Sequence, residues 1–175
     1  MAVRRFGCGV VLVGAWLVAS AGPGFSAKDA ALTTSGLPVP RYVSLKSDHV
    51  NVRAGPTKDN DVAWVYTRSG LPVEITAEFE NWRRVRDSEG AEGWVYHSML
   101  SGRRTAVITM KSKDDLASLY QSADAASPVV ARLQAGVVAQ VKHCAAGWCH
   151  VNGDGFDGWI EQPRLWGVYA DEKVD

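Results

Sequence analysis

Alternating apolar and polar residues dominate the chain beyond residue 41, and they predict short β-strands. Runs rich in Val, Ile, Thr, Tyr and Trp are bounded by Gly, Asn, Asp and Pro, which is typical of an all-β fold. One run places Leu71, Val73 and Ile75 on a single face, with Glu74 and Thr76 turned outward. We expect the apolar face of this strand to cover a core.

Two glycine-containing segments predict tight hairpins. Residues 87–90 read Asp-Ser-Glu-Gly, and residues 152–155 read Asn-Gly-Asp-Gly. These residue types tolerate positive φ angles. Each segment is therefore expected to close a hairpin into the next strand, which contains a Gly-Trp pair.

The same pattern occurs twice, with a period of about 66 residues. Gly70 precedes Trp82 by 12 positions, and Gly136 precedes Trp148 by the same number. Further matched positions are Val85 with Val151, Gly93-Trp94-Val95 with Gly158-Trp159-Ile160, and Leu100 with Leu165. The chain is therefore expected to contain two copies of one small β unit.

The motifs of both copies resemble those of the bacterial SH3 domain. The first copy has Val-Asn-Val-Arg-Ala-Gly-Pro at residues 50–56 and Gly-Trp-Val at 93–95, similar to the opening and closing segments of that family. The second copy has Gly-Trp-Ile at 158–160, but Ser-Leu-Tyr-Gln-Ser-Ala at 118–123 stands in place of the opening motif. The resemblance implies an all-β chain with two tandem small SH3-like β-barrels.

The repeat and its flanks define the expected domain organisation. Residues 42–103 are expected to form the first SH3-like domain and residues 104–168 the second. Residues 28–41 carry small side chains and two prolines without periodicity, which predicts a flexible lead-in. Residues 169–175 are expected to form a tail.

The N-terminal segment predicts export. Two arginines precede an apolar run at residues 7–19, a pattern typical of a secretory signal peptide in residues 1–27. Small residues favour cleavage after Ala21 or after Ala27. Because the run is shorter than the roughly 20 residues that span a bilayer, we expect a periplasmic or extracellular protein with no membrane span after cleavage.

The charge balance argues against two classes of partner. Two of the 19 Lys and Arg residues precede the apolar run, which leaves 17 against 19 Asp and Glu from residue 28 onward, a net charge near −2. Binding to nucleic acid or to an anionic membrane usually needs a strongly basic field. We therefore expect neither partner.

Cys144 and Cys149 are the two cysteines of the expected mature chain, and a pair in an exported protein favours a disulfide. Alternation counted from Val141 places His143 on the core face, so the bridge requires either a β-bulge before Cys144 or an early end to that strand. The alternative is a metal site that also uses His143 and His150. Strand alternation argues against that site because neighbouring side chains point to opposite faces.

No sequence motif indicates catalysis or a cofactor. The chain has no Gly-rich phosphate loop ending in Lys-Ser or Lys-Thr, no His-Glu-x-x-His and no Gly-x-Ser-x-Gly. Paired acids for glycoside cleavage are not singled out by any pattern. We expect a protein without enzymatic activity, cofactor or metal.

The resemblance implies a binding module for cell-wall peptidoglycan, with an adaptor for an extended segment of another envelope protein as the alternative. SH3-like barrels bind extended ligands in a shallow aromatic groove, and the candidate contacts are Arg53, Trp64, Tyr66, Trp82 and Tyr96.

Neighbouring residues leave two further questions open. For Trp94, a core role is favoured over a place in the groove, because large aromatic side chains dominate small cores. Arg83, Arg84 and Arg86 are either a positive rim for wall-peptide carboxylates or a solvated face balanced by acidic neighbours.

Overall fold

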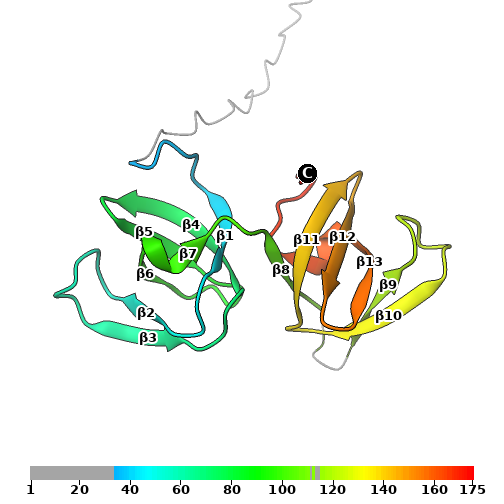
Figure 1. Cartoon of the computed structure of the whole chain (residues 1–175), viewed down its shortest axis with the longest axis horizontal. Helices are drawn as coiled ribbons and strands as arrows, with labels where there is room; N and C mark the ends of the chain where they lie inside the picture. The colour runs from blue at the N-terminus through cyan, green and yellow to red at the C-terminus, as the bar shows by residue number, and fades with distance from the viewer. Residues whose placement is uncertain (1–33, 111, 113–114) are drawn as a thin grey trace, which may run out of the picture.

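The computed structural model describes residues 34–110, 112 and 115–175. The predicted signal peptide and both predicted cleavage sites lie outside the described residues. The described residues form two β-barrels that lie side by side (Figure 1). The second barrel begins directly after the segment that connects it to the first.

Each barrel is built from one seven-stranded sheet. The strands of the first are β1 (Arg41–Leu45), β2 (Val50–Arg53), β3 (Val62–Tyr66), β4 (Pro72–Phe79), β5 (Trp82–Arg86), β6 (Glu92–Tyr96) and β7 (Leu100–Ser101). Those of the second are β8 (Thr105–Ile108), β9 (Leu116–Tyr120), β10 (Val129–Gln134), β11 (Val138–Ala145), β12 (Trp148–Gly153), β13 (Phe156–Glu161) and β14 (Leu165–Trp166).

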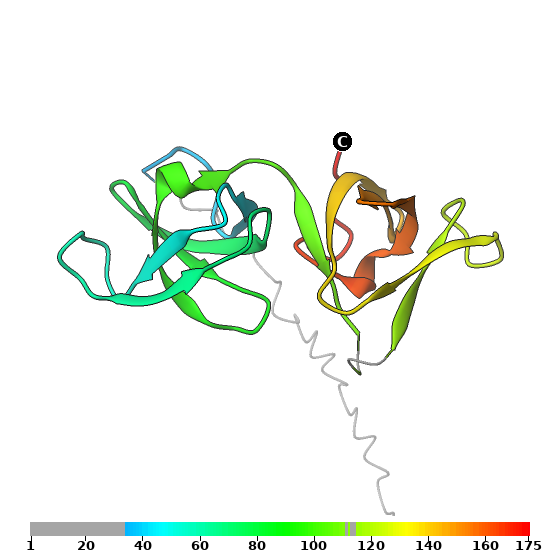
Figure 2. The same ribbon diagram turned by 60° about the horizontal axis from the view of Figure 1, so that its bottom comes forward.

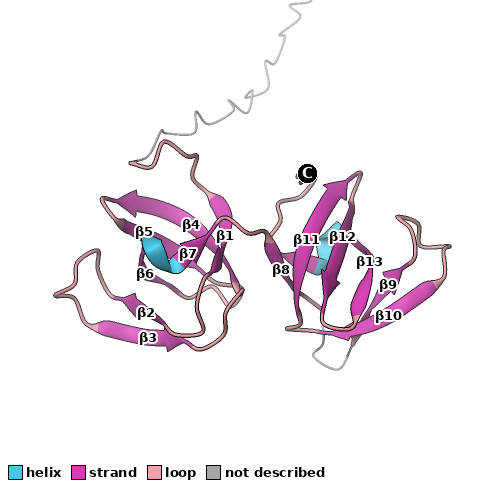
Figure 3. Ribbon diagram, viewed as in Figure 1, coloured by secondary structure: helices cyan, strands magenta, loops and turns pink. Residues whose placement is uncertain are grey.

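The two sheets have the same topology. Their strand orders are β3-β2-β6-β5-β4-β1-β7 and β10-β9-β13-β12-β11-β8-β14, so each strand of the first barrel has a counterpart seven numbers later. Two short 3-10 turns, His97–Met99 and Gln162–Arg164, also correspond and are the helical elements of the described residues (Figure 3). The predicted tandem SH3-like fold is confirmed.

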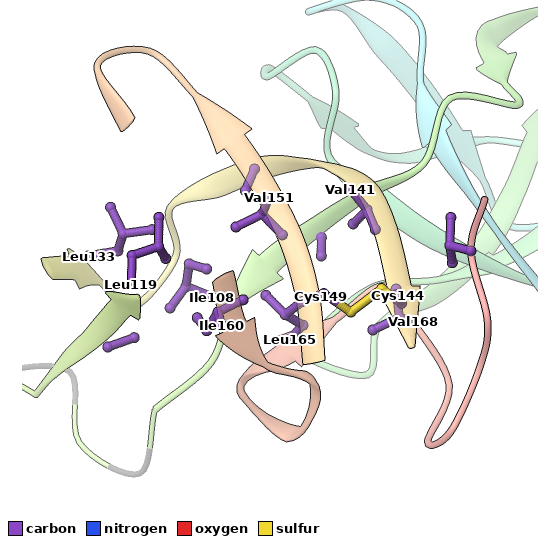
Figure 4. Close-up of a cluster of buried hydrophobic side chains, with 14 residues drawn as sticks. Ile108, Leu119, Leu133, Val141, Cys144, Cys149, Val151, Ile160, Leu165 and Val168 are labelled. Atoms are coloured by element: carbon purple, nitrogen blue, oxygen red, sulfur yellow. A yellow bond between two sulfur atoms is a disulfide. The ribbon is translucent and has the colours of Figure 1, made fainter. Parts of the chain in front are cut away.

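Alternating apolar residues fill each barrel. In the first, Val73 and Ile75 of β4 are buried with Val85 and Val95 from the next two strands. The second core is larger, and Figure 4 shows its aliphatic side chains with the Cys144–Cys149 bridge toward one end of the cluster. The inward face predicted for residues 71–75 is thus the core face of β4.

A β-bulge at the same place in both barrels explains the disulfide. The register between β11 and β12 shifts between Val141 and His143, and Cys144 then lies opposite Cys149. The two cysteines are fully buried and bonded to each other. The predicted bridge is therefore confirmed, and of the bulge and the early strand end that could permit it, the structure has the bulge. Both thiols of the alternative metal site are occupied by the bridge.

The first barrel carries an ion pair where the second carries the disulfide. Its register shifts between Ile75 and Ala77, which places Glu78 opposite Arg83. Arg83 Nε lies 3.1 Å from Glu78 Oε1, and the Glu78 side chain is only 1% exposed. At the same cross-strand position, an ion pair thus links the two strands in the first barrel and a disulfide links them in the second.

Both predicted glycine hairpins are present. Residues 87–90 join β5 to β6, and Gly90 has φ 88°. The second segment joins β12 to β13, and its Gly155 has φ 77°. Glycine meets no steric penalty at these angles, so each turn closes as the sequence predicts.

Glu74, on the outward face of β4, does not meet water, because the C-terminal segment of the second barrel covers it. Glu74 is only 4% exposed. The Tyr169 hydroxyl donates to Glu74 Oε1 over 2.9 Å, and Arg86 forms an ion pair with the other carboxylate oxygen. The Tyr42 ring contacts the rings of Trp166 and Tyr169, with centroids 5.1 and 4.6 Å away.

Residues at both ends of the described chain pack against the barrels. In the predicted lead-in, the backbone N–H and Oγ of Ser35 donate to Glu78 over 2.9 and 2.8 Å. In the predicted tail, Val174 is buried and exchanges backbone hydrogen bonds with Cys144. The N-terminal end thus contacts Glu78 of the ion pair in the first barrel, and the C-terminal end contacts Cys144 of the disulfide in the second.

Candidate ligand-binding groove of the first barrel

A groove of about 220 Å³ opens on the first barrel beside β2, β5 and β6, in the left half of Figure 1. It is lined by residues from these strands, from the loops before and after β2 and from the 3-10 turn after β6. The lining residues are His49, Asn51, Arg53, Lys58, Trp82, Tyr96 and Met99.

Strand alternation explains why these side chains gather here. On β2, Val50 and Val52 are fully buried in the core, so Asn51 and Arg53 face outward. Trp82 is paired with Tyr96 across β5 and β6. The groove is therefore a property of the outer barrel face.

An aromatic pair forms one wall of the groove. The Trp82 and Tyr96 rings lie 5.3 Å apart, nearly perpendicular at 81°. Trp82 is 8% exposed, so its ring is largely fixed by packing, whereas Tyr96 is only half-buried. An edge-to-face aromatic pair offers a rigid apolar surface to a ligand at little entropic cost.

The groove lining also carries two cations, Arg53 and Lys58. Arg53 donates from Nη1 to the Asn60 carbonyl over 2.6 Å, which holds its guanidinium at the groove. Lys58 is exposed nearby. Neither cation has a carboxylate partner among the described residues, and no acidic residue lines the groove. The groove therefore favours an anionic group beside an apolar one.

Three of the five residues predicted as ligand contacts, Arg53, Trp82 and Tyr96, thus meet in one groove. Trp64 and Tyr66 do not. They pair with Val52 and Val50 across β2 and β3, and both side chains pack against the core of the first barrel.

Tyr66 is held by its own hydrogen bond. Its hydroxyl donates to Asp87 Oδ2 over 2.9 Å. Burial and this hydrogen bond both raise the pKa of Tyr66.

The three arginines considered as a positive rim are each paired with an acid. Arg83 contacts Glu78, Arg84 Nη2 lies 2.5 Å from Glu92 Oε2, and Arg86 pairs with Glu74. Arg83 is moreover buried, at 8% exposure. These residues therefore do not form a free cationic surface.

The core role favoured for Trp94 is wrong. Gly93 and Val95 point into the barrel, so Trp94 points outward and is only half-buried. A Cβ at position 93 would lie 2.4 Å from Val52 Cγ1, which shows how closely the core approaches this glycine.

The second barrel has a counterpart of the groove with different chemistry. Tyr120 stands where the first barrel has Arg53, because Tyr120 pairs with Trp159 as Arg53 pairs with Trp94. Its lining includes Glu161 and Arg164, which pair with each other at 3.5 Å. Of these two grooves, only that of the first barrel is lined by cations that have no carboxylate partner among the described residues.

Sequence reasoning missed four groove residues: His49, Asn51, Lys58 and Met99. Alternation from the buried Val50 and Val52 would have placed His49 and Asn51 on the outer face with Arg53. Lys58 and Met99 lie in a loop and a turn, where no periodic signal exists.

Within residues 34–110, 112 and 115–175, no three His, Cys, Asp or Glu side chains are placed to hold one metal ion. The described helical turns include none with the length and hydropathy of a membrane span.

Two small antiparallel barrels, each with a shallow outer groove, define a tandem SH3-like protein. The bacterial SH3 domain family profile matches residues 46–102 and 113–167, so the chain belongs to this family and contains two of its domains. No curated protein matches the chain.

Two solved structures from Trichomonas vaginalis are similar to the chain. NlpC2 is 17% identical over 78% of this chain and 50% of its own, with a TM-score of 0.34. NlpC1 is also 17% identical, over 82% of this chain and 51% of its own, with a TM-score of 0.32. The matched region is thus about half the length of either protein.

Proposed function

We propose that this protein is an exported binding module without turnover, which holds a carboxylate-bearing peptide of the cell envelope in the groove of the first barrel. The observation that carries the proposal is the pairing of two unneutralised cations, Arg53 and Lys58, with the Trp82–Tyr96 wall. A peptide of peptidoglycan combines free carboxylates with small apolar side chains. Both kinds of group have a complement in this groove.

The contrast between the barrels supports one site rather than two. In the second groove Glu161 lies beside Arg164, so an incoming carboxylate meets a like charge there. Tyr120 in place of Arg53 removes the guanidinium that could bind a carboxylate in a bidentate manner. The second barrel, which the Cys144–Cys149 disulfide crosslinks, accompanies the first barrel without binding this ligand.

Export is part of the proposal. The buried Cys144–Cys149 bridge supports it, because disulfides persist in oxidising compartments such as the periplasm and the cell exterior. The N-terminal sequence pattern points to the same compartments.

A pull-down of the mature protein with purified sacculi tests the proposal. We expect retention at low salt, and at least tenfold weaker retention of an Arg53→Gln, Lys58→Gln double variant. The matched control is Arg132→Gln with Lys142→Gln, which removes the same charge from exposed positions outside the groove. Absence of retention, or equal loss in the control, would refute this function.

A second candidate, an adaptor for another envelope protein, is favoured by one observation. β3 lies at an edge of the first sheet, and Val62 on it is 41% exposed. An extended segment of a partner could add a strand at such an edge. Crosslinking in cells distinguishes the two candidates: discrete protein adducts support the adaptor, and adducts confined to wall material support the peptide-binding module.

A further inference from the structure

A cleft lies between the two barrels. It has a volume of about 600 Å³ and is bounded by the end of β1, the loop from β3 to β4, the connection from β7 to β8, and the hairpin between β12 and β13. Figure 2 shows the two barrels side by side and joined by that connection. This cleft shares no lining residue with the groove of the first barrel.

The floor of the cleft is polar and fixed. Ser44 and Thr105 are 1% and 5% exposed, and their hydroxyls lie 2.7 Å apart. Thr105 Oγ1 also donates to the Gly70 carbonyl over 2.8 Å, and Ser44 Oγ to the Arg103 carbonyl over 2.5 Å. The two barrels are therefore hydrogen-bonded to each other directly beneath the cleft.

A second hydrogen bond between the barrels involves Arg68, which lines the cleft. Arg68 donates from Nη1 to the Gly136 carbonyl of the second barrel over 3.0 Å. The interface of Tyr42 with Trp166 and Tyr169 joins the barrels as well. The width of the cleft is set by these contacts, so the segments that line it are positioned before any ligand arrives.

The charge of the lining is one-sided. Lys46, Arg68 and Arg103 come from three different segments and are all exposed, whereas Asp154 is the one acidic lining residue. None of these three cations has a carboxylate partner among the described residues, while six arginines elsewhere do. Positive charge is thus left unneutralised at the rim of a preformed polar cleft.

The geometry points to a second binding site in this cleft, for a ligand that carries two or more phosphate or carboxylate groups. A single inorganic ion would fill little of the volume of about 600 Å³. No aromatic side chain lines the cleft, so a polar, multiply charged ligand fits it better than an apolar peptide. Guanidinium groups bind both kinds of oxyanion in a bidentate manner.

Calorimetric titration of the disulfide-bonded mature protein with inorganic tripolyphosphate and, separately, with citrate tests the site at low ionic strength. We expect binding of at least one of these probes, and the preferred probe identifies phosphate or carboxylate as the natural group. A Lys46→Gln, Arg103→Gln double variant should weaken that binding at least tenfold. Neither of these side chains makes a described hydrogen bond or ion pair, so the variant is expected to keep the fold, which thermal unfolding verifies.

Two matched variants locate the effect. Arg132→Gln with Lys142→Gln removes the same charge from other exposed positions, and Arg53→Gln with Lys58→Gln removes it from the groove of the first barrel. Both should bind the probe within twofold of the wild type. Absence of binding to both probes, or an equal loss in either matched variant, would overturn the cleft site without bearing on retention by sacculi.

Discussion

Replacing Tyr169 by Phe tests how firmly the two barrels are joined. The tyrosine lies in the segment after β14, contacts the Tyr42 ring and donates its hydroxyl to the buried Glu74 of the first barrel over 2.9 Å. Phenylalanine keeps the ring and removes only the hydroxyl. The variant therefore isolates one hydrogen bond between the barrels.

The structure sets the size of the effect. Glu74 keeps Arg86 on its other oxygen, but at 4% exposure water has little access to replace the lost donor. A hydrogen bond to a charged group contributes about 1.5–3 kcal/mol. We expect the free energy of unfolding at pH 7 to fall by this amount.

The difference between the two proteins should depend on pH. Burial, the hydrogen bond to Glu74 and the charge of Glu74 all raise the pKa of Tyr169 above its usual value. A tyrosine with a raised pKa in the folded state stabilises the protein fully below the unfolded value of about 10, and the contribution is lost at higher pH. The stability gap between wild type and Tyr169→Phe should therefore narrow above pH 10.

Urea unfolding followed by tryptophan fluorescence measures both effects. With a slope of roughly 2 kcal/mol per molar urea, the midpoint should fall by about 1 M. Tyr120→Phe is the control, because its hydroxyl makes no hydrogen bond to the described residues and should change stability little. A Tyr169→Phe midpoint equal to the wild type, or an equal loss in Tyr120→Phe, would refute the proposed role of this hydrogen bond.

Three further outcomes are expected. Glu78→Gln should lower the free energy of unfolding by roughly 3 kcal/mol in urea titrations, because it leaves two largely buried guanidinium groups without their anion. Reducing the Cys144–Cys149 bridge should cost about 2 kcal/mol, seen as faster hydrogen exchange in β11 and β12 while β4 and β5 stay protected. Burial raises the pKa of Glu172, but its hydrogen bonds and the Arg104 charge outweigh burial and lower this pKa below the usual value of 4.5. The stabilisation that ionised Glu172 contributes should therefore be lost as pH falls below about 4.5. In melting experiments at a series of pH values, Glu172→Gln should weaken the dependence of stability on pH in this range.

The strands and their duplication were predictable because alternation and turn residues are local signals. An irregularity before Cys144, either a bulge or an early strand end, could also be inferred from the expected bridge, and the structure has the bulge. The burial of Glu74 beneath Tyr169 of the second barrel could not be inferred from the sequence. Alternation indicates which way a side chain points, but the residue that covers it lies 95 positions away in the sequence.

The groove was predicted only in part, for a reason of register. Trp64 and Tyr66 alternate as groove residues would, but their cross-strand partners are Val52 and Val50, which face the core. A shift of one residue in the pairing would have turned both aromatic side chains outward. Sequence pattern does not fix that pairing, whereas Arg53 could be selected from its place in a family motif.

The most direct test of peptide binding in the first groove is an NMR titration of the ¹⁵N-labelled mature protein with a soluble wall peptide that has a free C-terminal carboxylate. The account predicts shifts at the Arg53 side chain, the Trp82 indole N–H and the Tyr96 amide, and at least tenfold weaker binding when the carboxylate is amidated. Unmoved groove resonances, shifts centred on Tyr120 of the second barrel, or equal binding of the amidated peptide would contradict it.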